Sequence, residues 1–142
     1  MKNSNWINEI KYNLNVYANY DYDLTKMSYR SSYLSNTFYI VGGLNKNYKI
    51  NNVLINELGV VGLIKEVYDE YSVCEFINEV DNVSVDINGV FGTLNKSKDG
   101  LLIVDNISNY DEINLNDPVY TSTLGNIKEK LYIGRVFKVE EN

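Results

Sequence analysis

The chain has 142 residues, a length that suits one ordinary domain or two very small ones. Its hydrophobic fraction of 44% is sufficient for a packed core. The formal net charge of −6 argues against a nucleic-acid partner and against an anionic membrane surface, because both attract clustered Lys and Arg. No apolar run reaches the roughly 18 residues that a membrane span needs, and the polar N-terminus does not resemble a signal peptide.

The first segment of the chain has helical spacing. Apolar residues recur every third or fourth position from Trp6 to Leu14, which predicts a short N-terminal helix. From Leu14 to Ala18 the period changes to two, and a strand is expected there. The segment 20–36 is rich in Tyr, Ser and Asp and has no period, so we expect a loop.

Short β-branched and aromatic runs, separated by turn residues, make up the rest of the chain. No second helix of useful length is indicated, so the pattern predicts an all-β fold, either a sandwich or small barrels. The predicted strands are 37–41, 53–55, 60–67, 73–77, 83–87, 90–94, 101–104, 119–123 and 133–139.

The clearest hairpin signal follows strand 83–87. Hydrophobic and polar residues alternate strictly in this strand, so its three hydrophobic residues should face the core while Ser84 and Asp86 face outward. Asn88 and Gly89 come next, and both tolerate the positive φ angles of a type I′ turn. The sequence therefore predicts a tight β-hairpin that turns at this pair.

Glycines inside predicted strands indicate special backbone positions. Gly59 and Gly62 do not indicate a phosphate-binding loop, because the Lys-Ser/Thr pair and the following helix of such a loop are missing. Gly62 lies inside a predicted strand and therefore indicates a bulge or a tight bend. Gly134 indicates a bend or a close approach, and Gly134→Val is expected to destabilise the fold by about 1–3 kcal/mol through overpacking. Asp99 and Gly100 predict a further turn.

The residue types argue against catalysis. The chain contains no histidine, which removes Ser-His-Asp and Cys-His triads and His-containing zinc sites. The single cysteine, Cys74, lies among hydrophobic residues and is expected to be buried and unreactive. One cysteine can form neither an intramolecular disulfide nor a Cys-only metal site. We expect no catalytic residues, no cofactor and no metal.

Two kinds of side-chain cluster remain open to interpretation. Three carboxylate clusters occur in turn-like stretches, where they are expected to be solvated, and a weak calcium site or an acid–base pair is the alternative. These are Asp69-Glu70, Glu79-Asp81 and Asp111-Glu112. A tyrosine cluster indicates either a protein-binding patch or half-buried core partners. It consists of Tyr17, Tyr20, Tyr22 and Tyr29.

Three stretches, in this order along the chain, resemble the extracytoplasmic domain of the MreC family of rod shape-determining proteins. Residues 40–55, IVGGLNKNYKINNVLI, are similar to the strand, Gly-containing turn and second strand of that family, with Gly43 in the turn. Asn47 and Asn51 stand where the family tends to have glycines. Asn is the residue other than Gly that best tolerates the left-handed backbone region, so the turn can be kept.

The other two stretches are similar to later motifs of the family. Residues 56–67, NELGVVGLIKEV, resemble its "G-L-V-G-x-V-x-x-V" strand. Residues 115–125 and 133–136 resemble its "G-D-x-V-x-T-S-G-x-G" and "I-G-x-V" motifs. Here Asn116 and Thr123 replace glycines, Pro118 is unusual, and the loop between the two motifs lacks the usual Pro and Gly.

The resemblance implies two small β-barrels packed together, with the architecture of trypsin-like barrels but without catalytic residues. It implies three parts of the chain. Residues 1–13 form an N-terminal helix, the end of a coiled coil. Residues 14–58 form the first barrel, which can also recruit C-terminal strands, and residues 59–142 form the second. Gly43, Asn47, Gly62, Asn88, Gly89 and Gly134 are the expected structural turn positions.

The resemblance also implies a role as a non-catalytic scaffold of the bacterial cell-wall elongation machinery. The expected partners are further copies of the chain, bound weakly, and MreD, RodA and a penicillin-binding transpeptidase. The expected location is the outer face of the cytoplasmic membrane, with an N-terminal membrane anchor upstream of these residues. The alternative interpretation is a cell-wall module that binds peptidoglycan or another carbohydrate through its tyrosines.

Overall fold

The computed structural model describes residues 23, 25, 27–29, 37–97, 99–108 and 112–140. Within them the regular structure is ten β-strands and two short 3₁₀ helices, as predicted for an all-β chain. The predicted helix 1–13 and strand 14–18 lie outside the described residues. The first five strands are β1 (Met27–Tyr29), β2 (Thr37–Val41), β3 (Val53–Asn56), β4 (Gly59–Val67) and β5 (Tyr71–Phe76). The others are β6 (Val83–Ile87), β7 (Val90–Lys96), β8 (Leu102–Asp105), β9 (Pro118–Thr121) and β10 (Tyr132–Arg135).

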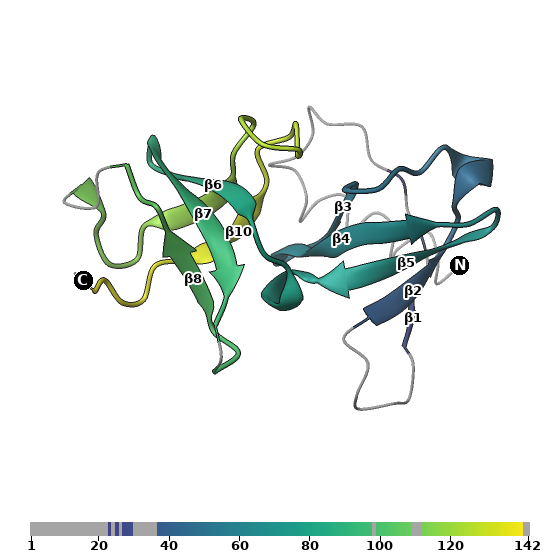
Figure 1. Cartoon of the computed structure of the whole chain (residues 1–142), viewed down its shortest axis with the longest axis horizontal. Coiled ribbons are helices and arrows are strands. Elements are labelled where there is room, and N and C mark those ends of the chain that lie inside the picture. The colour runs from purple at the N-terminus through teal and green to yellow at the C-terminus, as the bar shows by residue number, and fades with distance from the viewer. Residues whose placement is uncertain are drawn as a thin grey trace.

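The strands form two five-stranded antiparallel sheets that lie side by side (Figure 1). The first sheet has the order β1-β2-β5-β4-β3 and the second has the order β10-β9-β6-β7-β8. The chain passes from one sheet to the other through the 3₁₀ helix η3 (Ile77–Glu79). The predicted boundary between residues 58 and 59 does not coincide with this passage. It falls in the β3–β4 hairpin, where Asn56 pairs with Gly59.

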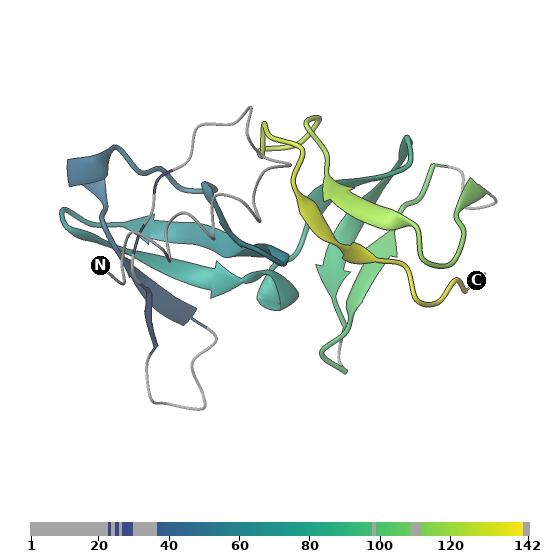
Figure 2. The same ribbon diagram turned by 180° about the vertical axis from the view of Figure 1, so that it is seen from behind.

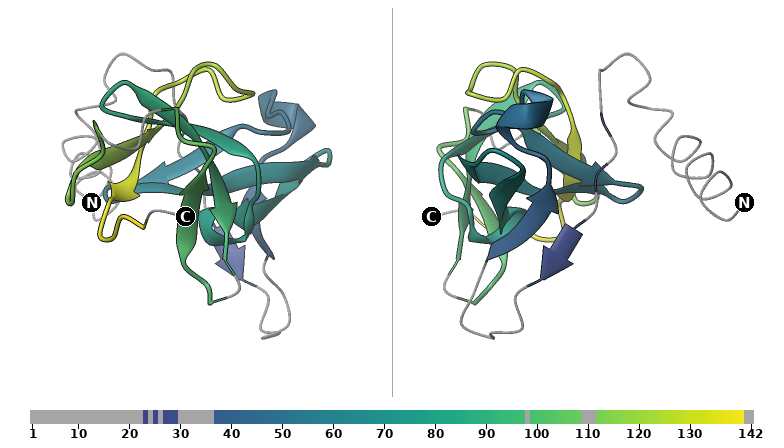
Figure 3. Two further views of the ribbon diagram at one scale, coloured as in Figure 1. Left: turned by 60° about the vertical axis from the view of Figure 1, so that its left-hand side comes forward. Right: turned by 90° about the vertical axis from the view of Figure 1, so that its right-hand side faces the viewer.

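The segment predicted as a loop contains the short strand β1. Its backbone pairs with β2, with Met27 opposite Ile40, and Figure 3 shows the two strands together. A strand of three residues is too short to display a hydrophobic period of its own. The strand β1 is recognised by its pairing with β2, and the hydrophobic periodicity of the sequence could not predict it.

The core of the first sheet comes from strict alternation in its central strands. Phe38 and Ile40 of β2 and Cys74 of β5 are buried, and they pack with Ile64 of β4. The rings of Phe38 and Phe76 lie 4.5 Å apart between centroids. Because side chains alternate across a strand, the neighbours of these residues lie on the opposite face of the sheet.

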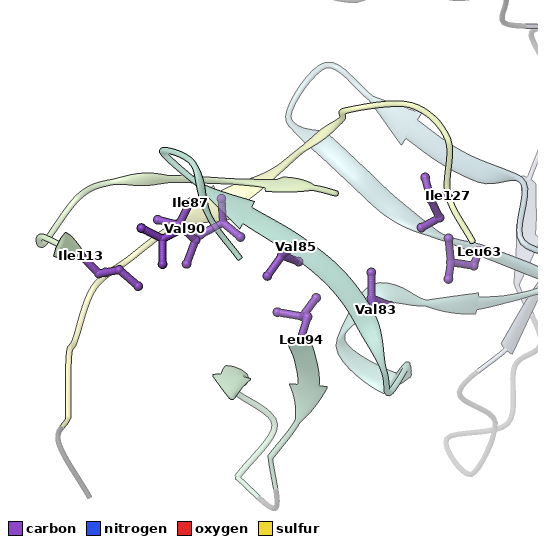
Figure 4. Packing of buried hydrophobic residues seen from close by; sticks show 9 residues of the cluster. Leu63, Val83, Val85, Ile87, Val90, Leu94, Ile113 and Ile127 are labelled. Carbon is purple, nitrogen blue, oxygen red and sulfur yellow. The ribbon is translucent and has the colours of Figure 1, made fainter. Parts of the chain in front are cut away.

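The larger core lies inside the second sheet. Val83, Val85 and Ile87 of β6 are buried, as predicted, and Figure 4 shows them with Leu94 and other side chains of this cluster. Ser84 and Asp86 point to the other face and are half-buried. The partially buried position of Asp86 is explained by its contacts: its carboxylate accepts a hydrogen bond from the Gly89 amide and lies 3.6 Å from the Lys130 ammonium.

The predicted hairpin joins β6 to β7. Ile87 pairs with Val90, and the two residues between them, Asn88 and Gly89, have φ angles of 52° and 87°. Positive φ at both central positions is what a type I′ turn requires. Asn47 and Asn116 have positive φ angles as well, at 60° and 72°.

Gly62 and Gly134 both lie beside an irregularity in strand pairing. The β3–β4 register shifts next to Gly62, and a Cβ atom there would lie 2.2 Å from the Glu75 carbonyl oxygen. The β9–β10 register shifts next to Gly134, but a Cβ atom there would have no heavy atom within 4 Å. The expected overpacking at Gly134 is therefore wrong, because the bulge holds this position in open space.

Residues from the end of the chain join the two sheets. Leu131 packs with Val60 of β4 in a small buried cluster, and Ile133 lies against it. Gly59 lies so close to Tyr132 that a Cβ atom would be 2.6 Å from the Tyr132 carbonyl oxygen. In Figure 2 the C-terminal segment runs along β9 on the side of the second sheet. This contact and the larger core together hold the sheets against each other.

Candidate interaction surfaces

One of the predicted carboxylate clusters, Glu79-Asp81, has structural contacts. The Asp81 carboxylate accepts a hydrogen bond from the Lys96 amide, and the Glu79 carboxylate lies 3.8 Å from the Lys96 ammonium, so both hold the end of β7. Asp69 and Glu70 lie in the exposed β4–β5 turn, and Asp111 is outside the described residues. Among the residues that the structure describes, no three or more Asp, Glu, Cys or His side chains form a group that could hold a metal ion.

Cys74 is fully buried in the first sheet. Burial raises the pKa of its thiol to about 12, because the apolar surroundings disfavour the thiolate. The neutral thiol therefore predominates at any physiological pH. A thiol of this kind behaves as a small hydrophobic side chain.

A small hollow of about 160 Å³ lies where the two sheets meet. Its polar lining includes Ser84 and Ser122, which belong to different segments of the second sheet. The Ser122 amide donates to the Ser84 carbonyl oxygen, and the Ser122 hydroxyl accepts a hydrogen bond from the Leu124 amide. The preceding residue, Thr121, bridges Glu129 and Leu131 through its hydroxyl. These hydroxyls anchor the loop 122–130.

The predicted tyrosine cluster lies outside the residues whose side chains the structure describes. The structure instead gathers aromatic and apolar side chains at the end of the first sheet, all of them exposed except Tyr39, which is half-buried. We call this group the tyrosine surface; it consists of Tyr39, Val41, Leu44, Tyr68 and Tyr71. It lies around the β4–β5 turn, at the end of the first sheet that is away from the second sheet (Figure 1).

The tyrosine rings are ordered relative to one another. Tyr68 and Tyr71 are stacked, with centroids 4.8 Å apart and an interplanar angle of 18°. Tyr39 meets Tyr71 edge-on at 6.0 Å. The Tyr68 hydroxyl donates to the Glu66 carboxylate at 2.6 Å, and this hydrogen bond raises the pKa of Tyr68. The sequence signal for this surface was present, since Tyr39 and Tyr71 occupy the outward phase of their strands.

A glycine pair lets the following loop close over the β4–β5 turn. The amides of Gly42, Leu44 and Asn45 donate to the carbonyl oxygens of Glu70, Tyr68 and Asp69. The buried Ser72 hydroxyl donates to the Gly42 carbonyl oxygen. At Gly43 a Cβ atom would lie 1.9 Å from the Tyr68 carbonyl oxygen, so only glycine allows the approach. Four hydrogen bonds thus fix the loop that carries Leu44, and a fifth, from the Tyr68 amide to the Tyr71 carbonyl oxygen, closes the β4–β5 turn itself.

A second exposed feature is the strand edge formed by β8. This strand has a neighbour, β7, on one side only. Leu102 and Val104 pack against the core, whereas Ile103 is 43% exposed and the preceding Leu101 is 50% exposed. An apolar edge strand of this kind offers unpaired backbone groups to another chain.

The other sheet edges are less suitable for pairing. The pairings of β3 with β4 and of β10 with β9 each contain a register shift, and such an irregularity bends the strands and makes the sheet edge less regular. The strand β1 has only three residues. In contrast, β8 pairs with β7 over four consecutive residues without a shift. Among the edges that the structure describes, β8 is the regular one.

These features define a two-sheet β module whose exposed features are an apolar strand edge and an aromatic surface. Residues 27–142 match the family model described as "Rod shape-determining protein MreC, barrel core". The chain belongs to the MreC family. Among curated proteins, no sequence gives a significant match. Within the described residues, no helix is long and apolar enough to span a bilayer.

Solved structures described as MreC share this fold. The chain resembles the major periplasmic domain of the cell shape-determining filament MreC, with a TM-score of 0.72 and 20% identity over 83% of this chain and 85% of that one. It resembles MreC from Listeria monocytogenes, with a TM-score of 0.70 and 20% identity over 93% of this chain and 72% of that one. For MreC from Pseudomonas aeruginosa the TM-score is 0.67, with 16% identity over 84% and 83% of the two chains.

Proposed function

We propose that this chain is a non-catalytic scaffold module of the cell-shape machinery, which acts outside the cytoplasm through protein–protein contacts and associates with itself. Family membership supports the role in cell shape, and the relatives described as periplasmic domains support the location. The single observation that carries self-association is the regular, apolar edge of β8. The family partners MreD, RodA and a penicillin-binding transpeptidase, and an upstream membrane anchor, belong to the same proposal.

The β8 edge favours pairing with a second copy. Two copies that add β8 to β8 in antiparallel orientation would be related by a two-fold axis, so the same surface serves both partners. Such pairing forms main-chain hydrogen bonds and covers Leu101 and Ile103. The contact area of one short strand is small, and the net charge of −6 on each copy opposes association. The self-association is therefore weak and depends on concentration.

The edge is tested by a charged substitution. Ile103→Lys places an ammonium group on the exposed side of β8, and natural edge strands use Lys in this way to prevent pairing. Sedimentation velocity over a range of concentrations should show reversible dimers for the unmodified chain and mostly monomers for Ile103→Lys. The matched control is Ile50→Lys, because Ile50 is also exposed, at 60%, and lies outside the strands.

The control decides how the result is interpreted. Ile50→Lys should sediment like the unmodified chain. If both substitutions weaken association equally, the effect is not specific to the strand edge and β8 is not the contact. If the unmodified chain stays monomeric at every concentration and instead sediments with purified cell wall, the carbohydrate-binding alternative replaces the scaffold proposal.

A further inference from the structure

We propose that the tyrosine surface binds a basic, extended polypeptide segment, with Arg or Lys side chains over the rings of Tyr68 and Tyr71. This inference rests on the proposed function in one respect, namely that the module acts through protein contacts. It concerns a different surface from β8, at the opposite end of the molecule, and a partner other than a second copy of this acidic chain (Figure 1).

The surface combines exposure with fixed geometry. Tyr68 and Tyr71 are 43% and 46% exposed although their rings are stacked, and Leu44 and Val41 beside them are about 60% exposed, at 59% and 61%. Hydrogen bonds hold the loop that carries Leu44 against the β4–β5 turn. A surface that is already ordered loses little conformational entropy when a ligand binds. Contiguous exposed apolar side chains with a polar rim are typical of binding sites.

The charge around the rings favours a cation. Glu66, Asp69 and Glu70 are exposed around the two tyrosines. Within the described residues neither Asp69 nor Glu70 forms an ion pair. The nearby Lys65 ammonium forms an ion pair with the Glu75 carboxylate, at a distance of 2.9 Å. Lys46 and Lys49 are exposed cations of the neighbouring loop, and the three carboxylates outnumber them.

The chemistry of the rings agrees with that charge. The face of an aromatic ring attracts an ammonium or guanidinium group, and nearby carboxylates add to this attraction. Phosphate-bearing partners, such as nucleic acids and anionic lipids, would be repelled by the same carboxylates. A basic polypeptide can form cation–π contacts with the rings and is attracted by the carboxylates, and its apolar side chains can cover Val41 and Leu44.

The shape of the site favours an extended segment. An open hollow of about 590 Å³ lies along the turn, lined by Leu44, Val67, Tyr68, Asp69, Glu70 and Tyr71. The lining residues belong to the β4–β5 turn and to the loop after β2, and Figure 3 includes a view that faces this end of the molecule. An extended peptide can lay Arg or Lys side chains on the rings and apolar side chains on Val41 and Leu44 at different points along its length.

The test uses a defined probe. A fluorescein-labelled peptide of about eight residues, alternating Arg and Leu, is titrated with the full chain in a fluorescence polarisation assay. We expect saturable binding that weakens as the salt concentration rises, because the carboxylates are solvent-exposed. The double substitution Asp69→Lys/Glu70→Lys should weaken binding by about tenfold or more. Tyr71→Leu keeps an apolar side chain but removes the ring, and it should weaken binding about threefold.

Two controls separate this site from a general effect of charge. Asp99→Lys/Glu112→Lys changes the net charge equally on exposed positions of the second sheet, and it should leave the affinity within about twofold of the unmodified chain. The Ile103→Lys variant should also bind normally, so a failure of the β8 proposal is seen separately. The inference is overturned if both double substitutions weaken binding equally, if a peptide of alternating Glu and Leu binds as tightly, or if Tyr71→Leu has no effect. Thermal melts of each variant establish that it is folded.

Discussion

Asparagine supplies the left-handed backbone positions of this chain. Among the described residues, every non-glycine residue with positive φ is an asparagine. They are Asn47, Asn51, Asn82, Asn88, Asn106 and Asn116. The short side chain of asparagine forms hydrogen bonds with the local backbone, and asparagine therefore adopts the left-handed backbone region more readily than other non-glycine residues do. Asparagine residues are thus used structurally at the turns of this chain.

Substitution by alanine should affect the free energy of unfolding strongly at Gly43 and only slightly at Gly134. Gly43→Ala places a methyl group against the Tyr68 carbonyl oxygen and should lower the free energy of unfolding by about 3 kcal/mol. Gly134→Ala meets open space, and because it reduces the entropy of the unfolded chain it should change stability by less than about 1 kcal/mol. Urea denaturation of both variants measures the difference. Equal destabilisation would contradict the packing described for Gly43.

Local sequence shows where a glycine interrupts a strand but not what lies across from it. Gly62 and Gly134 have similar contexts, each within a run of hydrophobic residues, and both were interpreted as tight positions. The backbone of β5 crosses close to Gly62, whereas nothing crosses Gly134. The space around each glycine depends on which segment lies next to it in the fold. The residues adjacent to the glycine in the sequence do not contain that information.

At the scale of elements, the β6–β7 hairpin was predictable in full because all its information is local. Alternation gave the buried face, and the Asn-Gly pair gave the turn. The short strand β1 and the division between the sheets were not predictable in this way. Both depend on pairing between segments far apart in the sequence, as does the meeting of Tyr39 with Tyr68 and Tyr71.

The buried face of the hairpin can be tested by truncation. Val85→Ala removes buried methyl groups from the centre of the larger core and should lower the free energy of unfolding by about 2–3 kcal/mol. Val41→Ala is the matched control, since Val41 is 61% exposed and should lose less than about 0.5 kcal/mol. Chemical denaturation compares the two. A larger loss for Val41 would mean that the faces of these strands have been assigned wrongly.

At the scale of the whole molecule, two sheets held by a common seam present different surfaces at opposite ends. The tyrosine surface lies around the β4–β5 turn of the first sheet, and β8 is an edge of the second sheet; Figure 1 shows this turn and this strand in opposite halves of the molecule. A module with two separated surfaces can bind a second copy and a different partner at the same time. Two weak contacts in one assembly strengthen each other through effective concentration.

Disulfide trapping at β8 tests the central claim of self-association most directly. In Ile103→Cys, antiparallel pairing of two copies would bring the new thiols close enough for a disulfide. The native Cys74 does not compete, because it is buried and its pKa is raised to about 12. We predict that mild oxidation converts Ile103→Cys to covalent dimers much faster than Ile50→Cys, with a rate that rises with protein concentration. Equal rates for the two variants would show that β8 is not the contact and would contradict the account.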